Sequence, residues 1–340
     1  MRIFRSLEEV PADFGPAVVT VGNFDGVHCG HQQVLREVVR RARDTGSRAI
    51  AVTFDPHPLR ILRPDAAPKL ITPQPLKEKL MAHSGLDALL VVPFTRDFSM
   101  MTAEDFSRAV LADKLLAREV HEGESFHFGH KAQGTPARLQ ELGRELGFAV
   151  KLYPVMMMRG SPVSSSGIRA LLSAGRVSRA ARLLGRVFSI TATPGRGRGY
   201  GHKYTVPTIN LSRYDELVPG DGVYFTRTRV GDETFDSVTN VGNRPTFGDE
   251  SFAIETHLLD FHPLDVTAQT EVEISFLRWR RGEIKFPSVE ALKKQIGEDV
   301  ARAQRYFDLL KKHSALSSQR SAISPAARFP KMPALPKNPT

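Results

Sequence analysis

Two histidines lie three positions apart in a glycine-rich segment near the start of the chain, residues 22–31, Gly-Asn-Phe-Asp-Gly-Val-His-Cys-Gly-His. Their imidazole nitrogens can donate hydrogen bonds to phosphate oxygens and stabilise negative charge that develops when a phosphate group is transferred. A single histidine in a turn is more often a bystander at the start of a helix. As a unit, however, the segment that holds His28 and His31 favours a phosphate-binding site.

The residues on either side of this segment predict the elements that hold it. Residues 18–21 are a short apolar, β-branched run of the kind found in buried parallel strands. From His31 onward the apolar residues follow helical spacing, with Val34 and Leu35 on one face. A strand, a glycine loop and a helix start point main-chain N–H groups at an anion, which agrees with a phosphate site.

A second group of polar residues stands far from the first in sequence. Three serines, residues 164–166, precede a helical pattern that carries Arg169. Their hydroxyls can cap the helix, and together with the guanidinium they can also bind an anion, so the residues alone leave both interpretations open. His57 lies in an Asp-Pro-His-Pro turn after another apolar run. Adenylyl transfer needs mainly this kind of positioning and charge neutralisation.

A third candidate is a glycine-rich loop that contains Gly195, Gly197 and Gly201 and precedes Pro-Thr-Ile-Asn. It is not a dinucleotide fingerprint, because no βαβ unit follows, and no Gly-Lys-Ser/Thr ends it as in a Walker loop. A flexible linker is the alternative for the loop alone. Thr208 and Asn210 add hard oxygen ligands that suit Mg²⁺, so loop and tetrapeptide together favour a MgATP site.

Glu255 is the candidate general base of the second half of the chain. It lies in an apolar strand pattern and faces away from Ile254 and Thr256. A carboxylate in that position can accept the proton of a substrate hydroxyl. A solvated strand glutamate is the alternative when the residue is considered alone.

The composition limits the classes of protein to consider. The chain has 340 residues, 41% of them hydrophobic and 25% charged, which is ordinary for a soluble protein with room for two cores. Its net charge of +10 comes from scattered basic residues, which argues against nucleic-acid binding and fits polyanionic small molecules. The single cysteine, Cys29, excludes an intramolecular disulfide. With no apolar run of membrane-spanning length and no signal-peptide core, we expect a cytoplasmic protein.

The first half of the chain alternates between strand and helix patterns, which predicts a doubly wound parallel sheet with ligands at the carboxyl ends of its strands. The strand patterns cover residues 18–21, 49–54, 89–94, 120–128 and 149–155. The helical patterns cover residues 31–45, 76–85, 103–114, 136–147, 169–174 and 175–185.

Residues 186–286 show short alternating strands separated by turn residues, the pattern of a small antiparallel β-barrel. An amphipathic helix is expected over residues 287–312. We therefore expect an α/β domain over residues 1–184, a β-barrel domain over 185–313 and a disordered basic tail over 314–340.

Several motifs together resemble those of the bacterial bifunctional riboflavin kinase/FAD synthetase family, over residues 18 to about 310. In the first half these are residues 22–31, Thr-Phe-Asp-Pro-His-Pro at 53–58, Gly-Glu-Ser-Phe-His-Phe-Gly at 123–129 and Ser-Ser-Ser-Gly-Ile-Arg at 164–169. In the second half they are the glycine loop with Pro-Thr-Ile-Asn, residues 222–224, 240–246, 254–260, Phe-Leu-Arg at 276–278 and residues 285–286.

The resemblance implies an α/β domain followed by a β-barrel, and an enzyme that phosphorylates riboflavin with MgATP and then adenylylates FMN to FAD. The implied catalytic residues are His28, His31, Arg169 and Glu255. The implied ATP- and phosphate-binding residues are Gly22, Asn23, Phe24, Gly26, Ser165, Ser166, Gly195, Gly197 and Gly201. The implied flavin-binding residues are His57, Phe126, Phe128 and Arg278, and the implied Mg²⁺ ligands are Thr208 and Asn210.

The sequence departs from the family pattern at Ser125, His127 and Thr135, which concerns the FMN and adenine contacts, and at Ser166, Thr205 and Ile209. The expected partners are the small molecules ATP, riboflavin and FMN, with no membrane and no nucleic acid, and weak self-association is left open. Two rival hypotheses remain: another nucleotidyltransferase, against which the Pro-Thr-Ile-Asn barrel argues, and a flavin-binding regulator that has lost catalysis.

Overall fold

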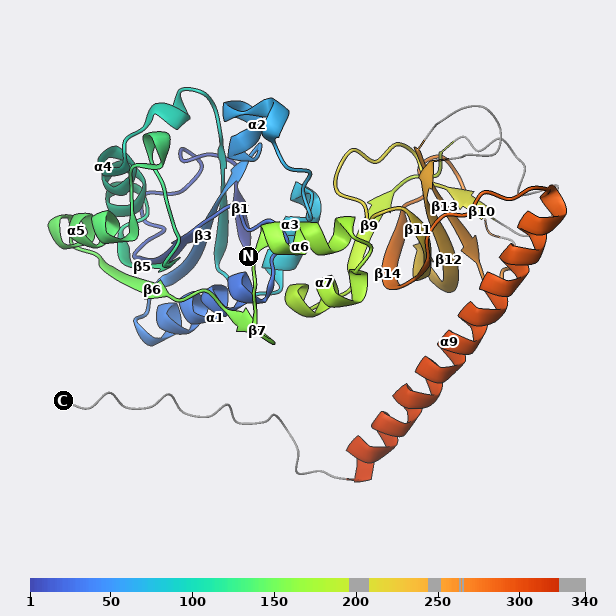
Figure 1. Cartoon of the computed structure of the whole chain (residues 1–340). Coiled ribbons are helices and arrows are strands. Elements are labelled where there is room, and N and C mark those ends of the chain that lie inside the picture. Colours follow the sequence, from blue (N-terminus) through green and yellow to red (C-terminus); the bar gives the residue numbers. More distant parts are fainter. Residues whose placement is uncertain (196–207, 244–251, 263, 265, 324–340) are drawn as a thin grey trace. The chain divides into compact units, whose positions relative to one another are not determined.

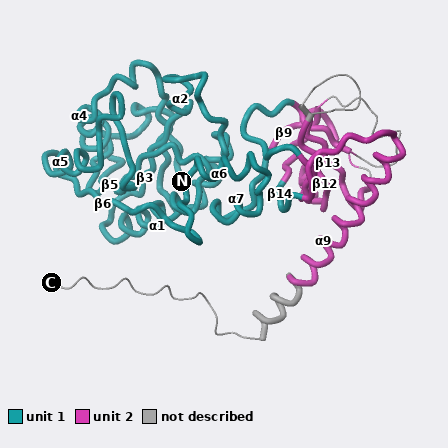
Figure 2. Tube along the Cα trace, viewed as in Figure 1, with its two compact units in different colours: residues 1–190, 213–221, 275–279 teal, residues 191–212, 222–274, 280–340 magenta. Residues whose placement is uncertain are grey.

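The computed structural model describes residues 1–195, 208–243, 252–262, 264 and 266–323 (Figure 1). The chain divides into two compact units (Figure 2). The first comprises Met1–Ile190, Arg213–Asp221 and Ser275–Trp279, and the second comprises Thr191–Ser212, Gly222–Ile274 and Arg280–Thr340. Gly197, Gly201 and Thr205 lie outside the described residues. The boundary between residues 184 and 185 stays a prediction.

The first unit is built on a parallel sheet, as predicted, with the strand order β1-β4-β3-β2-β5-β6 in its described residues. The strands are Arg2–Phe4 (β1), Ala17–Val21 (β2), Arg48–Asp55 (β3), Ala88–Pro93 (β4), Ala117–Gly123 (β5) and Ala149–Tyr153 (β6). The predicted strand over 120–128 is displaced, because the chain turns after Gly123. The order reverses beside β2, and such a reversal leaves a ligand crevice at the carboxyl ends of the strands.

Helices cover both faces of this sheet (Figure 1). Alternate residues of β2 show the two layers: Val19 packs with Val110 and Leu139, whereas Val18 packs with Leu35 and Val38. The helices are Cys29–Asp44 (α1), Pro58–Leu62 (α2), Gln74–Ala82 (α3), Ala103–Asp105 (α4) continued by the π-helical Phe106–Lys114 (η3), Pro136–Leu146 (α5), Ser165–Ser173 (α6) and Val177–Leu184 (α7). Short 3₁₀ turns, Pro64–Ala66, Phe98–Met100 and His130–Ala132, and the small hairpin of Met157–Met158 (β7) and Ser161–Pro162 (β8) complete the described part of the unit.

The second sheet is antiparallel and curls toward closure, which confirms the predicted barrel-like fold. Its strand order in the described residues is β10-β13-β12-β11-β14-β9. The strands are Phe188–Ala192 (β9), Thr208–Asn210 (β10), Gly222–Val230 (β11), Glu233–Asn243 (β12), Phe252–Leu258 (β13) and Val272–Arg281 (β14). The continuations of the two outer strands meet in a bridge between Pro194 and Leu211.

The final helix, α9, runs from Val289 to Ile323. The predicted disorder from residue 314 is therefore wrong for residues 314–323, while residues 324–340 lie outside the described part. Alanine, leucine, glutamine and arginine in residues 315–320 favour a helix, and the first proline after Pro287 is Pro325. The prolines on which the expectation rested come after the helix has ended.

The burial of side chains on the inner face of α9 indicates how much the helix contributes to the stability of its unit. Phe307 is 1% exposed, and Leu309 on the same helix is 57% exposed. Phe307→Ala should lower the free energy of unfolding by about 3–5 kcal/mol, because it leaves a cavity in place of a buried ring. Leu309→Ala should change it by less than about 0.5 kcal/mol. Denaturant unfolding of both variants is the measurement, and equal effects would mean that α9 does not pack through Phe307.

Candidate active sites

The loop between β2 and α1 has an unusual backbone. Phe24, Gly26 and Val27 have φ angles of 47°, 87° and 38°. These lie in the left-handed region of backbone conformation, which residues other than glycine rarely adopt. Phe24 and Val27 are nevertheless buried, each 3% exposed. Such strain persists where the surrounding structure fixes the backbone, and it is concentrated at functional sites. The conformation therefore supports the importance that the sequence gives to residues 22–31.

The Asp25 carboxylate is the group that fixes this loop. It is buried, accepts hydrogen bonds from the main-chain N–H groups of Ile71 (3.2 Å) and Thr72 (2.9 Å), and pairs with Arg169 Nη2 at 2.6 Å. The N–H of Gly26 donates to Thr72 Oγ1 at 2.9 Å. Sequence reasoning did not select Asp25 as a site residue, although a carboxylate within a glycine–histidine loop is a signal that could have found it.

The two histidines stand together at the start of α1. His28 is the N-cap, and its Nδ1 accepts the N–H of His31 at 3.3 Å. Their rings are stacked, with centroids 3.5 Å apart and planes at 15°. Burial lowers the pKa of His28 to about 4 and lowers that of His31 well below its usual value. Both are therefore neutral at pH 7, and each offers one N–H donor.

His31 also has an open nitrogen. Its Nδ1 is buried and has no hydrogen-bond partner among the described residues. The ring packs edge-on against Phe24, with centroids 5.3 Å apart. Buried polar atoms are normally hydrogen-bonded, so this nitrogen is available to a polar ligand.

Capping, one of the two interpretations that the sequence left open for the serines and Arg169, is confirmed for Ser164, and anion binding stays a prediction. Ser164 is the N-cap of α6 and accepts the N–H of Gly167 at 3.2 Å. Ser165 Oγ donates to the carbonyl oxygen of Asp25 at 2.8 Å, and Arg169 Nε donates to that of Lys69 at 3.1 Å. The predicted group thus joins the loop of residues 22–31. Ser166 is exposed in the first turn of α6.

The pKa of His57 is affected by charged residues that lie in and around the loop of residues 22–31. It is the N-cap of α2 and accepts the N–H of Leu59 at 3.3 Å. Burial is the main reason why its pKa is lowered to about 4, and the charges of Arg169 and Lys77 act in the same direction while that of Asp25 opposes them. The charges of Asp25, Arg169 and Lys77 thus act on His57, and its role in flavin binding stays a prediction.

The two phenylalanines predicted to contact flavin differ in exposure. Their rings are stacked with centroids 5.2 Å apart. Phe128 is 9% exposed and packs with Phe106 in the core, whereas Phe126 is partly exposed. Of this pair, Phe126 has more surface to offer a ligand. Thr135, one of the departures from the family pattern, is the N-cap of α5.

A buried carboxyl that sequence reasoning missed lies where β2 and β5 separate. The pairing of these strands extends to Val19 and Val120, and beyond it Glu122 accepts the N–H of Val21 at 2.5 Å. Glu122 is 4% exposed, and burial raises its pKa well above the usual value. The Glu122 carboxyl group therefore holds the end of the strand that leads into the loop. A single glutamate in a strand pattern gives no sequence signal of this kind.

In the second unit, strand pairing brings the predicted kinase residues together. Asn210 on β10 lies opposite Glu255 on β13, and Thr208 lies opposite His257. Thr256, between Glu255 and His257, is fully buried and points inward. Thr208, Asn210 and Glu255 therefore share the outer face of the sheet, where directly opposite residues have Cβ atoms about 5 Å apart. Hydroxyl and amide oxygens beside a carboxylate fit a hard cation such as Mg²⁺.

Gly195 begins the glycine loop and touches the same strand. Its N–H donates to the carbonyl oxygen of Asn210 at 2.8 Å. A Cβ atom at this position would lie 2.8 Å from the carbonyl oxygen of Leu211, so the close approach requires glycine. Arg278 is exposed on β14.

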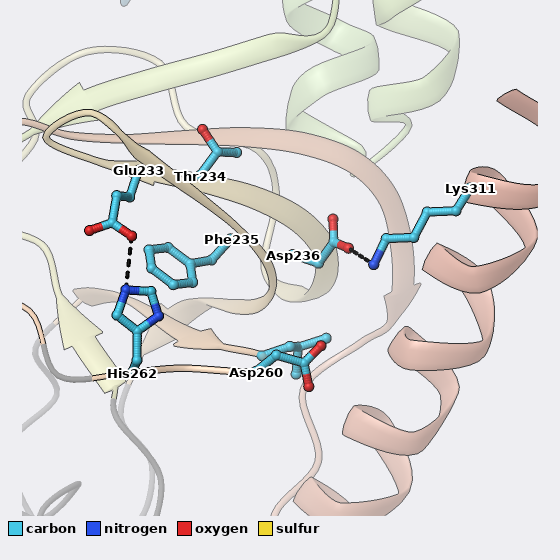
Figure 3. A pocket seen from close by; sticks show the side chains of 8 residues that line it. Glu233, Thr234, Phe235, Asp236, Asp260, His262 and Lys311 are labelled. Atoms are coloured by element: carbon cyan, nitrogen blue, oxygen red, sulfur yellow. Dashed lines mark ion pairs between the residues drawn. The ribbon is translucent and has the colours of Figure 1, made fainter. Parts of the chain in front are cut away.

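A pocket in the second unit lies elsewhere (Figure 3). Two ion pairs cross it, between Glu233 and His262 at 2.9 Å and between Asp236 and Lys311 at 3.1 Å. Its lining residues are Glu233, Thr234, Phe235, Asp236, Leu259, Asp260, His262 and Lys311. It contains none of the residues that the sequence selected, so it does not coincide with the candidate kinase site.

In the comparisons with known proteins, two family models match two consecutive parts of the chain. A family model described as FAD synthetase matches residues 10–167, and one described as riboflavin kinase matches residues 184–307. A bifunctional riboflavin kinase/FMN adenylyltransferase of Pseudomonas fluorescens is 32% identical over 305 residues, covering 89% of this chain and 97% of that protein. One of Buchnera aphidicola subsp. Acyrthosiphon pisum is 31% identical over 314 residues, covering 92% of this chain and 100% of that protein.

A solved structure also resembles the chain over both units. It is described as a macrolide-efflux protein from Streptococcus pneumoniae, is 25% identical, covers 89% of this chain and 98% of its own, and has a TM-score of 0.78. Among helices in the described part of the present chain, none combines the length and apolar character that a bilayer span requires.

The lowered pKa of His28 predicts a pH dependence of stability. Its value is 6.5 when unperturbed and about 4 in the folded protein, so between these values the unfolded state binds more protons. The stability that this difference contributes is complete above pH 6.5 and is lost as the pH falls toward 4. Between pH 7 and pH 5 the wild type should therefore lose about 1–2 kcal/mol more than His28→Asn, which keeps an N-cap acceptor.

Denaturant unfolding at the two pH values is the measurement. His83→Asn, which changes an exposed histidine, is the control and should leave the pH dependence unchanged. The same loss of stability in wild type and His28→Asn would show that folding does not lower the pKa of His28.

Proposed function

The chain belongs to the family of bifunctional riboflavin kinase/FMN adenylyltransferases, and we propose that it performs the two reactions at two separate sites, one in each unit. The chain phosphorylates riboflavin to FMN and adenylylates FMN to FAD with release of pyrophosphate. The observation that carries the assignment of the first site is the neutral His28–His31 pair at the start of α1, beside a loop fixed by Asp25 and Arg169.

In adenylyl transfer, a phosphate oxygen of FMN attacks the α-phosphorus of ATP, and pyrophosphate leaves. The protein must orient both phosphates and stabilise the charge that moves to the leaving group. Neutral His28 and His31 would donate hydrogen bonds to the phosphate oxygens, because their lowered pKa values make them hydrogen-bond donors rather than cations. Residues 22–26, Ser165, Ser166 and Arg169 would complete the nucleotide site at the start of α1.

Flavin recognition is proposed at residues around this crevice and on the barrel. The charges of Arg169 and Asp25 act on the His57 side chain. Phe126 offers a partly exposed ring for stacking on the isoalloxazine. Phe128, which is buried, would hold the Phe126 ring in place by stacking on it and would not itself contact the flavin. Arg278 would act on the flavin from β14.

In the kinase unit, Glu255 would take the proton of the ribityl hydroxyl as its oxygen attacks the γ-phosphate of ATP. Thr208 and Asn210 would hold Mg²⁺, which supplies charge neutralisation at the phosphates when bound. The loop with Gly195, Gly197 and Gly201 would cover the phosphates through its N–H groups. The register that sets Asn210 opposite Glu255 supports this assignment.

The remaining proposals concern context. We propose a domain boundary at residues 184–185, a cytoplasmic enzyme, and substrates limited to ATP, riboflavin and FMN.

His31→Ala tests the first site. It should lower the rate of FAD formation from FMN by about 10²–10³-fold, because one oxyanion-stabilising donor is lost. FMN formed from riboflavin should still accumulate, since that reaction uses the other unit. Chromatography of both products from one preparation is the measurement, with His83→Ala as the surface control. Undiminished FAD synthesis by folded His31→Ala protein would remove His31 from the site.

Glu255→Gln tests the second site. The amide keeps the size of the side chain but removes the basic carboxylate, so kinase kcat should fall by about 10²–10⁴-fold with a much smaller change in KM. FMN supplied directly should still be converted to FAD. Glu271→Gln, on a partly exposed glutamate of the same unit, is the matched control. If both reactions persist in Glu255→Gln, the base lies elsewhere, and if both are lost in a folded protein, the sites are not independent.

A further inference from the structure

A buried lysine lies beside the loop of residues 22–31. Lys77 is in α3, and it is 4% exposed. Its Nζ donates to Thr53 Oγ1 over 3.4 Å, and Thr53 Oγ1 donates to the carbonyl oxygen of Asn23, also over 3.4 Å. One hydroxyl group therefore connects the ammonium of Lys77 to the main chain of the loop, through two hydrogen bonds that are long for their type.

The positive charge of Lys77 is poorly compensated. Among the described residues, no carboxylate forms an ion pair with its ammonium: Asp25 pairs with Arg169, and Glu78 pairs with Arg5. Burial lowers the pKa of Lys77, because desolvation penalises the charged form, while the charges of Asp25, Asp55 and Glu78 act in the opposite direction without overcoming it. A buried ammonium with one long hydrogen bond is costly to the fold unless an anion joins it.

The surroundings of the loop hold further positive charge. Arg186 Nη1 donates to the carbonyl oxygen of Val27 at 3.4 Å, and burial lowers the pKa of Arg186 to about 10. Cationic groups of Lys77, Arg169 and Arg186 thus surround a loop whose own carboxylate, Asp25, is already paired with Arg169. Because His28 and His31 are neutral, the protein's own positive charge near a bound polyanion comes from such groups.

We propose that Lys77 is a further catalytic residue of the adenylyl-transfer site, whose ammonium binds the polyphosphate of ATP from the side of β3. The inference rests on the proposed site of His28 and His31. In the reaction the bond between an FMN phosphate oxygen and the α-phosphorus forms, and the bond to pyrophosphate breaks with its electron pair on the leaving group. Lys77 keeps its protons throughout and neutralises charge on the phosphates.

Lys77→Met tests this role, because methionine keeps a long side chain without the charge. FAD formation from FMN and MgATP should fall about 10²–10³-fold, as expected for loss of one preorganised cation. FMN formation from riboflavin should stay within about twofold, because it takes place in the other unit. The melting temperature without ligand should stay the same or rise, since an uncompensated buried charge is replaced by an apolar group. The rise in melting temperature caused by pyrophosphate should be reduced.

Lys79→Met is the matched control, because Lys79 is exposed on the same helix two residues away. It should leave FAD formation and the effect of pyrophosphate at wild-type values. Unchanged FAD formation in Lys77→Met would overturn the inference. So would a lower melting temperature with an equal loss of both reactions, which would mark Lys77 as a structural cation.

The proposed site itself is tested separately in the same experiment. If His31→Ala loses FAD formation while Lys77→Met retains it, the site stands and the role of Lys77 fails. If both variants retain FAD formation, the site of His28 and His31 fails and the inference about Lys77 fails with it.

Discussion

The first unit depends on one buried carboxylate. Asp25 joins the loop after β2 to the turn at Ile71 and Thr72 and, through its ion pair, to Arg169 of α6. These bonds offset a backbone with left-handed Phe24 and Val27, each of which costs on the order of 1–3 kcal/mol. Without the carboxylate, the N–H groups of the turn and the guanidinium would be left without their acceptor in a buried place. The geometry of the loop of residues 22–31 is therefore a property of three segments rather than of its own residues.

In this part of the molecule, hydrogen-bond donors and positive charges are provided by different residues. The stacked pair His28–His31 is held neutral by burial, so it provides direction and donors but little net charge. The positive charge lies on longer side chains that come from other elements, such as Arg169 of α6. Preorganised donors and fixed charges in a buried site need little rearrangement during the reaction, which is how enzymes stabilise charge that develops on phosphates.

The sequence predicts the architecture well where its signals are local. The apolar runs of β2, β3 and β4 identify the sheet, and the glycine loop marks the edge at which we propose a ligand site. The short β1 was missed because Arg2–Phe4 becomes a strand only by pairing with β4. The partners of Asp25 are 46 and 144 residues away in the chain, and no local pattern announces them. The same holds for Glu122, whose burial follows from the separation of β2 and β5.

The segment Arg213–Asp221, which connects β10 to β11, belongs to the first compact unit (Figure 2). Within that unit, Glu216 accepts hydrogen bonds from Arg60 and from the N–H of Leu70, and the N–H of Gly220 donates to the carbonyl oxygen of Leu172. The first compact unit is therefore not encoded by one continuous stretch of the chain. A fragment that ends near residue 184 lacks the acceptor for Arg60 and Leu70, and one that begins there carries a loop whose ordering surface is encoded upstream. Residues that follow β10 in the chain thus complete the hydrogen bonding of the first unit.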